Sequence, residues 1–542
     1  MNHTSAAGDQ TDAPTPPAIQ GPSAGQPSLR SWLDQLEAVG ELKRITTKVD
    51  WDEEIGAIAR VNLSLGGPAL LFQNIKGYED ARCTRFMTCG VGERRKVALM
   101  LGLPAETTEK ALVRHLKDTY RNPIEPVTVS SGPVKDVVLT GKDINLWEFP
   151  TPKWHASDGG RFIDTFCGVI THDMETDRAN VGLYRGQVLS KRKVGKLLIP
   201  TQGWGTHFGK YKDAKNRMPV AIAHGWHDAL PFCAGSPFPK HICEWDMIGA
   251  ITGQPVELVD CETVPLQVPA TAEIVVEGWI DPDPDPASFQ MEGPFADYPG
   301  YLGGKPSPKP VLKVTAVTHR KDPILRGALE GARPGFPSED SPLCAFSWSA
   351  IAWNMLEDAG VAGVSDVWMP PVSTGTNIVV QIRKRYRGHA LQIGHALWGT
   401  GSGQWFFKNV TVVEEDIDIR DPVALDWAIA FRVNAGRGDV AIVGPTFGSV
   451  LDPSTLAADR DVAKFGTGKW HRVLIDATRS WEHEPKLEFG GHRYPPLNKI
   501  APKLERKLKK RWAKYGIGID YLDDEARELL TMEALSKVFD EV

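Results

Sequence analysis

The sequence has few cysteines, and their arrangement excludes two kinds of protein. There are seven, an odd number, no two form a CxxC pair, and they are scattered at Cys83, Cys89, Cys167, Cys233, Cys243, Cys261 and Cys344. A disulfide-stapled secreted domain needs an even framework of cysteines, and a thiolate zinc site needs closely spaced pairs. The pattern therefore predicts a protein of the reducing cytoplasm.

Long hydrophobic runs and an excess of positive charge are also absent. No apolar run approaches the roughly 18–20 residues that a membrane helix needs, and the first basic residue is Arg30, so no basic segment opens a signal peptide. Lys plus Arg total 62 against 68 Asp plus Glu, so the net charge is −6. The basic cluster 506–514 is interpreted as a solvated helix face. We expect neither a membrane nor a nucleic-acid partner.

Several common catalytic motifs are missing. The sequence contains no GxxxxGK[ST] phosphate loop, no HExxH zinc helix, no GxSxG nucleophile elbow and no EF-hand loop. Gly399, Gly401 and Gly403 form a GxGxG, but the strand and helix that flank a dinucleotide-binding loop are not predicted around it. These absences argue against the enzyme classes that depend on such motifs.

What the sequence does contain is the composition of a globular protein. Hydrophobic residues make up 42% and charged residues 24% of its 542 residues, and this length suggests about three domains. Residues 1–27 lack aromatic side chains and are rich in Pro, Ala, Gly, Ser and Thr, which predicts a disordered tail. Residues 28–125 predict an N-terminal α/β domain. Its first helix begins after an N-cap at Ser28, ends at Gly40 and carries an apolar face of Leu29, Trp32, Leu33 and Leu36.

The rest of the chain divides into two further regions and a tail. Residues 126–330 contain the apolar or alternating runs TFCGVITHD, KLLIPTQ, PVAIAHGWH, AEIVVEGWI and VLKVTAVTHR, which predict a mainly β domain, a barrel or closed sheet, with one helix after Pro239. In residues 331–500 predicted helices and strands alternate, as in a second α/β layer. The charged segment 501–542 predicts a terminal helix that docks elsewhere.

Three short segments carry candidate chemistry. NVGLYR, from Asn180 to Arg185, places an arginine at a strand end, where it suits carboxylate capture or an ordinary surface ion pair. EGPFAD, from Glu292 to Asp297, holds either a close carboxylate pair with split titration or two solvated loop acids. In HICEWD, Glu244 opens a helix, where it complements the helix dipole or binds a divalent metal. No segment decides between these alternatives alone.

Taken in order, these segments and their neighbours resemble one family. NVGLYR, CEWDMIGAITG, VELVDC, VPATAEIVVEG and EGPFADYPGY are similar to the UbiD family of decarboxylases that use prenylated FMN. GHALQIGHALWG, Lys408 and NVTVVEEDIDIRDP continue the resemblance over nearly the whole predicted ordered chain. It implies an N-terminal α/β domain, a central split β-barrel flavin-binding domain and a C-terminal α/β domain with a terminal docking helix. It also implies a homodimer or homohexamer.

The resemblance also implies roles for single residues. Arg185 matches the arginine between flavin and substrate carboxylate, and Glu292 and Asp297 match the two active-site acids. Asn180 and Glu244 match ligands of a divalent metal, usually manganese, that binds the flavin phosphate, and a potassium ion commonly accompanies it. The remaining matches concern the cofactor: Leu183, Tyr184, Gln202 and Gly203 line it, and Lys408 lies near its phosphate end.

One position departs from the family pattern. Several members carry a metal-binding histidine directly after the position of Gln202, where this sequence has Gly203. His207 is close in sequence, but we interpret it as a buried or surface residue rather than a ligand. A metal with fewer protein ligands would depend more on phosphate and water, which hard cations accept.

The implied activity is the reversible non-oxidative decarboxylation of an aromatic, heteroaromatic or α,β-unsaturated acid. Cleavage leaves two electrons on an sp² carbon, and the prenylated flavin would accept them while the protein orients the acid and returns a proton. A flavin prenyltransferase would supply this cofactor. Two alternatives remain: an ordinary FMN-binding redox protein, and a subunit of a multi-component carboxylase.

Overall fold

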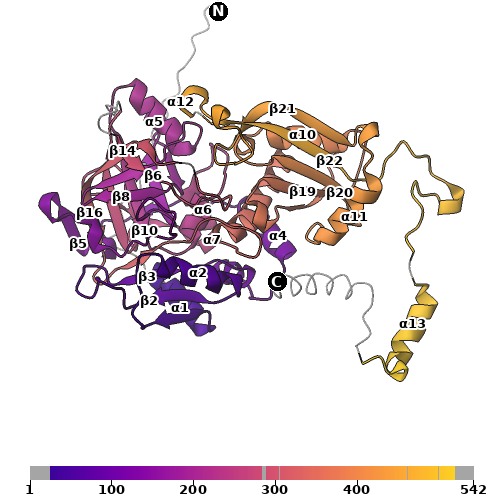
Figure 1. The fold of residues 1–542 in the computed structure, drawn as a ribbon, viewed down its shortest axis with the longest axis horizontal. Coiled ribbons are helices and arrows are strands. Elements are labelled where there is room, and N and C mark those ends of the chain that lie inside the picture. The colour runs from indigo at the N-terminus through magenta and orange to yellow at the C-terminus, as the bar shows by residue number, and fades with distance from the viewer. Residues whose placement is uncertain (1–24, 283–288, 304, 461, 499, 519–542) are drawn as a thin grey trace, which may run out of the picture.

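The computed structural model describes residues 25–282, 289–303, 305–460, 462–498 and 500–518, and Figure 1 shows their arrangement. The N-terminal region packs below the central sheet, and the C-terminal region lies beside that sheet (Figure 1). The predicted tail 1–27 falls almost wholly outside the described residues, as does the end of the predicted docking segment. No helix within the described ranges is long and apolar enough to cross a membrane.

The N-terminal region is a small α/β unit. It comprises α1 (Leu29–Ala38), β1 (Leu42–Ile45), α2 (Glu54–Ser64), β2 (Ala69–Phe72), β3 (Arg85–Thr88), α3 (Arg94–Met100) and α4 (Glu109–Thr119). The predicted first helix is confirmed, because the Ser28 hydroxyl accepts a hydrogen bond from the Ser31 amide and the four apolar residues are buried. A later strand, β17 (Ile324–Arg326), pairs with β3 and completes the sheet β1-β2-β3-β17.

The central region is built on one curled eight-stranded sheet. Seven strands follow the order β7-β6-β10-β13-β16-β9-β8, and β5 also pairs with β16. Their bounds are β5 Val137–Thr140, β6 Cys167–His172, β7 Ala179–Gly182, β8 Gly186–Ser190, β9 Lys193–Lys196, β10 Met218–His224, β13 Ile274–Ile280 and β16 Val311–His319. Smaller elements flank this sheet: β4 Val127–Thr128, β11 Glu257–Asp260, β12 Gln267–Pro269, β14 Gln290–Glu292, β15 Ser307–Lys309, α5 Gly203–Asp213, α6 Ala229–Ala234 and α7 Glu244–Thr252.

The predicted barrel is present as a curled sheet that strand pairing does not close. In the described residues β7 and β8 are the two edge strands of the main path, although only residues 183–185 separate them in the chain. This short connection crosses from one edge to the other, and we call it the seam. Of the run KLLIPTQ, only Lys196 belongs to a strand, and Leu197 and Ile199 beyond it line a cavity.

The C-terminal region confirms the predicted alternation of helices and strands. Its sheet has the order β18-β19-β20-β22-β21, with parallel pairs in the middle and antiparallel pairs at both edges. The bounds are α8 Asp340–Pro342, a π-helix Leu343–Trp348, α9 Ser349–Asp358, β18 Val364–Trp368, β19 Asn377–Ile382, α10 His389–Trp398, β20 Asn409–Glu414, α11 Pro422–Arg432, β21 Val440–Gly448, α12 Val462–Phe465 and β22 Gly468–Asp476.

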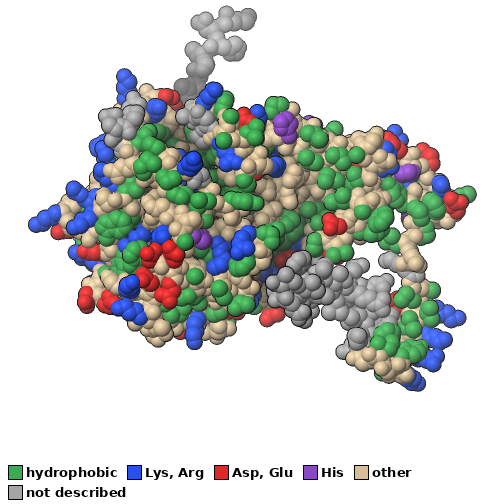
Figure 2. Space-filling model, in the orientation of Figure 1, with side chains coloured by type: hydrophobic (Ala, Val, Ile, Leu, Met, Phe, Trp, Pro, Cys, Tyr) green, Lys and Arg blue, Asp and Glu red, His purple; other side chains and the backbone are tan. Residues whose placement is uncertain are grey.

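One helix lies apart from the main body. This helix, α13 (Pro502–Arg511), has no buried residue, and an extended segment connects it to the C-terminal sheet (Figure 1). Figure 2 shows hydrophobic side chains on one side of this arm and Lys and Arg on the other. The basic cluster is therefore a solvated helix face here, as the sequence predicts. Docking onto another subunit stays a prediction.

Candidate active site

A cavity of about 840 Å³ lies between the open sheet and the C-terminal region. Its size falls in the range of small-molecule and cofactor sites, roughly 300–1,000 Å³. The seam residues Leu183, Tyr184 and Arg185 line it from the central region, and Trp405 and Phe406 line it from the C-terminal region. The seam lies outside the strands of the sheet, and its side chains line the cavity.

Arg185 lies at one end of the cavity, bound by two acids. Its Nε and Nη2 atoms donate to the two oxygens of Glu292 at 2.9 and 3.0 Å, and its Nη1 donates to Asp297 Oδ2 at 2.7 Å. Burial opposes the charge of the guanidinium, but the two carboxylates outweigh it and raise the pKa of Arg185. The fold thus brings together three residues that the sequence separates by about a hundred positions.

The guanidinium is held in place without being saturated. Arginine has five N–H donors in a planar fork, and these hydrogen bonds use three of them. The Phe295 ring lies 5.6 Å from the guanidinium carbon. The remaining donors suit a substrate carboxylate, and the paired acids can take or return a proton nearby.

Two further acids near this end were not predicted from the sequence. Glu330 and Asp340 both line the cavity, and the Ser338 hydroxyl donates to Asp340 Oδ2 at 3.2 Å. Burial and the neighbouring carboxyl groups, including Asp297, raise the pKa of both. They stand ten residues apart in a region without a motif, so no sequence signal distinguishes them from solvated loop acids.

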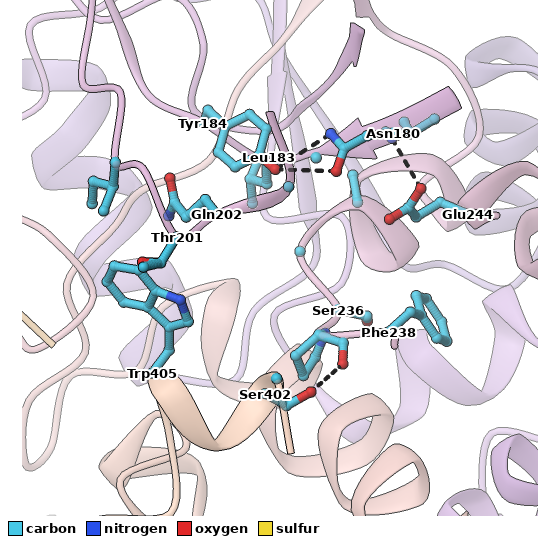
Figure 3. Close-up of a pocket in the computed structure, with 18 of the residues that line it drawn as sticks. Asn180, Leu183, Tyr184, Thr201, Gln202, Ser236, Phe238, Glu244, Ser402 and Trp405 are labelled. Atoms are coloured by element: carbon cyan, nitrogen blue, oxygen red, sulfur yellow. Dashed lines mark hydrogen bonds between the residues drawn. The ribbon is translucent and has the colours of Figure 1, made fainter. Parts of the chain in front are cut away.

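Asn180 and Glu244 lie together toward the other end of the cavity (Figure 3). Asn180 ends up here because it lies on β7, and Glu244 because it opens α7 beside that strand. Glu244 Oε2 accepts a hydrogen bond from the Val181 amide at 3.0 Å, while burial raises the pKa of Glu244 to about 7. Amide and carboxylate oxygens are the donors that Mg²⁺ and Mn²⁺ prefer, so this pair fits a divalent cation.

Gly203 leaves room for this arrangement. A Cβ atom built at Gly203 would lie 1.8 Å from Asn180 Oδ1, so the amide occupies the space that a side chain at position 203 would need. Nearby, the Tyr184 ring stacks on Trp204 with centroids 4.6 Å apart, and Asn180 Nδ2 donates to the Tyr184 hydroxyl at 3.3 Å. Gln202, the N-cap of α5, also lines the cavity.

His207 is buried, which is one of the two positions, buried or surface, that the sequence predicts for it. Its Nδ1 lies 3.0 Å from the Thr171 hydroxyl, and burial lowers its pKa to about 4, so the ring is neutral. The one described group of three His, Cys, Asp or Glu side chains close enough to hold a metal is Asp164, Cys167 and His224. This group contains neither His207 nor Glu244. The Lys196 ammonium already binds its Asp164 at 2.8 Å.

Lys408 lies outside the cavity lining. Its ammonium group donates to Asp452 Oδ2 at 2.7 Å and to the Ser454 hydroxyl at 2.5 Å, beside a smaller pocket. Among the described basic side chains, Arg178 and Lys240 line the cavity near the Asn180 end instead. The expected role of Lys408 beside a phosphate stays a prediction.

The C-terminal wall contributes residues that the sequence only partly signals. Trp405 lines the cavity and lies below Gln202 in Figure 3, whereas Trp398 is buried and donates to the Phe407 carbonyl. The Ser402 hydroxyl donates to the Pro237 carbonyl at 2.7 Å, which ties this wall to the central region. Such contacts depend on how the regions pack, which local sequence patterns do not encode.

Comparison with known proteins identifies related families and structures. The three domains of 3-octaprenyl-4-hydroxybenzoate carboxy-lyase (UbiD) match residues 33–116 (N-terminal), 125–333 (Rift-related) and 343–477 (C-terminal). An uncharacterized protein of Aquifex aeolicus is 33% identical over 519 residues, which cover 90% of this chain and 98% of that protein.

Solved structures match over similar lengths. The UbiD-class enzyme HmfF from Pelotomaculum thermopropionicum, in complex with FMN, is 32% identical with a TM-score of 0.72, over 88% of this chain and 98% of that one. Vanillic acid decarboxylase of Sedimentibacter hydroxybenzoicus in closed form is 30% identical with a TM-score of 0.80, over 90% and 100% of the two chains. Its open form gives a TM-score of 0.73.

Proposed function

The chain belongs to the UbiD family of carboxy-lyases, and we propose that it decarboxylates an aromatic, heteroaromatic or α,β-unsaturated acid with prenylated FMN. Decarboxylation is the activity of the class, which includes vanillic acid and 3,4-dihydroxybenzoic acid decarboxylases. The observation that carries the proposal is Arg185 in contact with both Glu292 and Asp297 beside a cavity of cofactor size. A small carboxylic acid is therefore the expected substrate.

Prenylated FMN is the proposed cofactor because solved HmfF structures contain FMN or prenylated FMN. The residues proposed to hold it are Leu183, Tyr184, Gln202 and Gly203, in a central split-barrel domain that we assign to residues 126–330. When bound, this group would supply the electron sink that no side chain provides. Residues 28–125 and 331–500 are the proposed N- and C-terminal domains, with 501–542 as an oligomer contact.

A divalent ion, manganese or another hard cation, is proposed between Asn180, Glu244 and the flavin phosphate, with potassium close by. Supporting this, Glu244 is a half-buried acid whose pKa burial raises to about 7, and it accepts a hydrogen bond from the amide of Val181, the residue after Asn180. A positive ion there would favour its charged form. Arg178 and Lys240, which line the same end, are better placed than Lys408 to meet a phosphate group.

The proposed roles of the protein's own side chains follow from their contacts. Arg185 orients the substrate carboxylate through its remaining N–H donors. Glu292, which is buried, or Asp297 returns a proton to the carbon that loses the carboxyl group. Trp405 and Phe406 cover the cavity from the C-terminal side and exclude water from it.

The test is a panel of carboxylic acids offered to protein co-expressed with a flavin prenyltransferase, with release of CO2 as the readout. We expect turnover of at least one aromatic or α,β-unsaturated acid by the isolated chain, which we propose to be a homodimer or homohexamer. Protein made without the prenyltransferase should carry plain FMN or remain inactive. Full turnover with FMN alone would favour the alternative of an ordinary FMN-binding protein. Turnover only with an added subunit would favour the alternative of a multi-component carboxylase.

A further inference from the structure

The seam between β7 and β8 leaves its backbone without a strand partner. Tyr184 lies in the middle of this connection, and its carbonyl accepts a hydrogen bond from Lys196 Nζ at 2.9 Å. Lys196 is the last residue of β9, lies opposite Gly186 in the β8–β9 pairing, and has a fully buried side chain. A buried ammonium group thus replaces the ladder hydrogen bond that a closed sheet would supply.

Asp164 completes this contact from the other side. Its Oδ2 accepts from Lys196 Nζ at 2.8 Å, and its Oδ1 lies 3.2 Å from His224 Nε2. The same Oδ2 packs against Gly186, where a Cβ atom would lie only 1.9 Å away. Although burial opposes its charge, Lys196 and His224 hold the pKa of Asp164 below its usual range. The pair therefore touches the backbone on both sides of Arg185.

We propose that Lys196 and Asp164 are a positioning pair that fixes the Tyr184–Gly186 backbone across the seam and so places Arg185 against Glu292 and Asp297. Neither residue needs to touch the reacting carbon for this role. The kinetic part of the inference rests on the proposed function, but the structural part does not. A shift of about 1 Å in a positioned group can cost about 10²-fold in rate, so a loosened seam should be visible in turnover.

The test compares Lys196→Met, Asp164→Asn and the double variant with wild type. Each single variant leaves one buried charge without its partner and should lower the Tm, whereas the double variant removes both charges and should regain most of that loss. The Tyr184 carbonyl still lacks its ammonium donor in the double variant. We expect hydrogen exchange in the peptide spanning residues 183–188 to rise about tenfold, and kcat/KM to fall about 100-fold.

Lys96→Met is the matched control. Lys96 is another fully buried lysine, and it donates to the Gly67 carbonyl at 2.7 Å in the N-terminal region, away from the cavity. Its loss should lower the Tm while leaving kcat/KM and exchange at 183–188 unchanged.

The outcomes separate this inference from the proposed function. If wild type decarboxylates no acid, the proposed function fails, and the exchange measurement alone decides the role of the pair. If wild type is active, the double variant decides the inference. A stable double variant whose kcat/KM, or whose hydrogen exchange at the seam, equals that of wild type would overturn it. A loss of kcat/KM equal to that in Lys96→Met would overturn it as well, because the effect would then be one of general stability.

Discussion

The two ends of the cavity differ in how their charges are balanced. At the Arg185 end, the guanidinium forms ion pairs with two carboxylates, at 2.9 Å to Glu292 and 2.7 Å to Asp297. At the other end, within the described part of the chain, Glu244 forms no ion pair, and burial raises its pKa to about 7. Arg185 is thus paired without a ligand, whereas Glu244 has no ion-pair partner among the described residues.

This difference suggests how the two ends work. A preorganised group of charges costs no reorganisation when a reaction begins, which suits the end where we propose that the carboxyl group is lost. A buried acid without a counter-charge is unfavourable on its own and gains stability when a cation binds. We therefore expect variants at the two ends to fail differently: one set in turnover, the other in ligand binding.

The largest effect is expected from Arg185→Ala. Removing one partner of a buried charge pair costs about 2–5 kcal/mol, and here it also removes the donors that we propose for the substrate carboxylate. We expect kcat/KM to fall by about 10²–10³-fold or more, with Mn²⁺ content unchanged. Arg192→Ala, in the exposed turn between β8 and β9, is the control and should keep full activity. Equal activity of the two variants would contradict the role of Arg185.

The opposite pattern is expected from Glu244→Ala. Loss of a carboxylate ligand should weaken Mn²⁺ binding by at least about 100-fold, since even residues that only support ligands contribute 10–100-fold. Electron paramagnetic resonance of bound Mn²⁺ and flavin absorbance measure the two losses separately. Asp246→Ala, two residues along the same helix, should retain both ligands. Wild-type metal and flavin content in Glu244→Ala would show that the metal site is misassigned.

A smaller effect is expected from Gly203→Ala. The added Cβ atom would lie 1.8 Å from Asn180 Oδ1, so the amide must move away from its present position. We expect flavin and Mn²⁺ affinity to fall by about tenfold, or about 1.4 kcal/mol. Gly209→Ala is the matched control on the same helix, because nothing lies within 4 Å of its Cβ position. Similar affinities in the two variants would contradict the close approach at Gly203.

The last effect concerns the pH dependence of stability rather than turnover or binding. Burial and Asp340 raise the pKa of Glu330 well above its ordinary value of 4.5. The folded protein then holds a proton that the unfolded chain has released, so the free energy of unfolding falls as pH rises from about 4.5 toward the raised pKa, by at most about 1.4 kcal/mol per pH unit. Glu330→Gln should flatten this slope in denaturant titrations at pH 5 and pH 8. An unchanged slope would mean that Glu330 ionises normally.

Much of the local structure could be predicted from the sequence because it depends on near neighbours. The face of α1 follows from the spacing of Leu29, Trp32, Leu33 and Leu36, and a serine cap marks its start. The strand β16 follows from its alternation, since Leu312 and Val314 are buried and Lys313 is exposed. The candidate acids and Arg185 came from motif order and from the resemblance to a family.

The remaining features depend on contacts between distant segments. The open seam could not be predicted because strand periodicity gives no strand order, and the run KLLIPTQ did not reveal that β9 ends at its first residue, Lys196. Glu330 and Asp340 become notable only when the fold buries them together. Lys408 illustrates the reverse: its match to a motif does not bring its ammonium group, which binds Asp452, into the cavity lining.

The most direct test of the proposed active site compares wild type with Glu292→Gln. The quantity measured is the rate of CO2 release per bound flavin from the best acid of the panel. Glutamine keeps the shape of Glu292 but cannot cycle a proton, and general acid–base steps are worth about 10²–10⁴ in rate. We expect a fall of that size at unchanged flavin and Mn²⁺ occupancy. Equal rates in the two proteins would contradict the assignment of the Arg185 end as the place where the carboxyl group is lost.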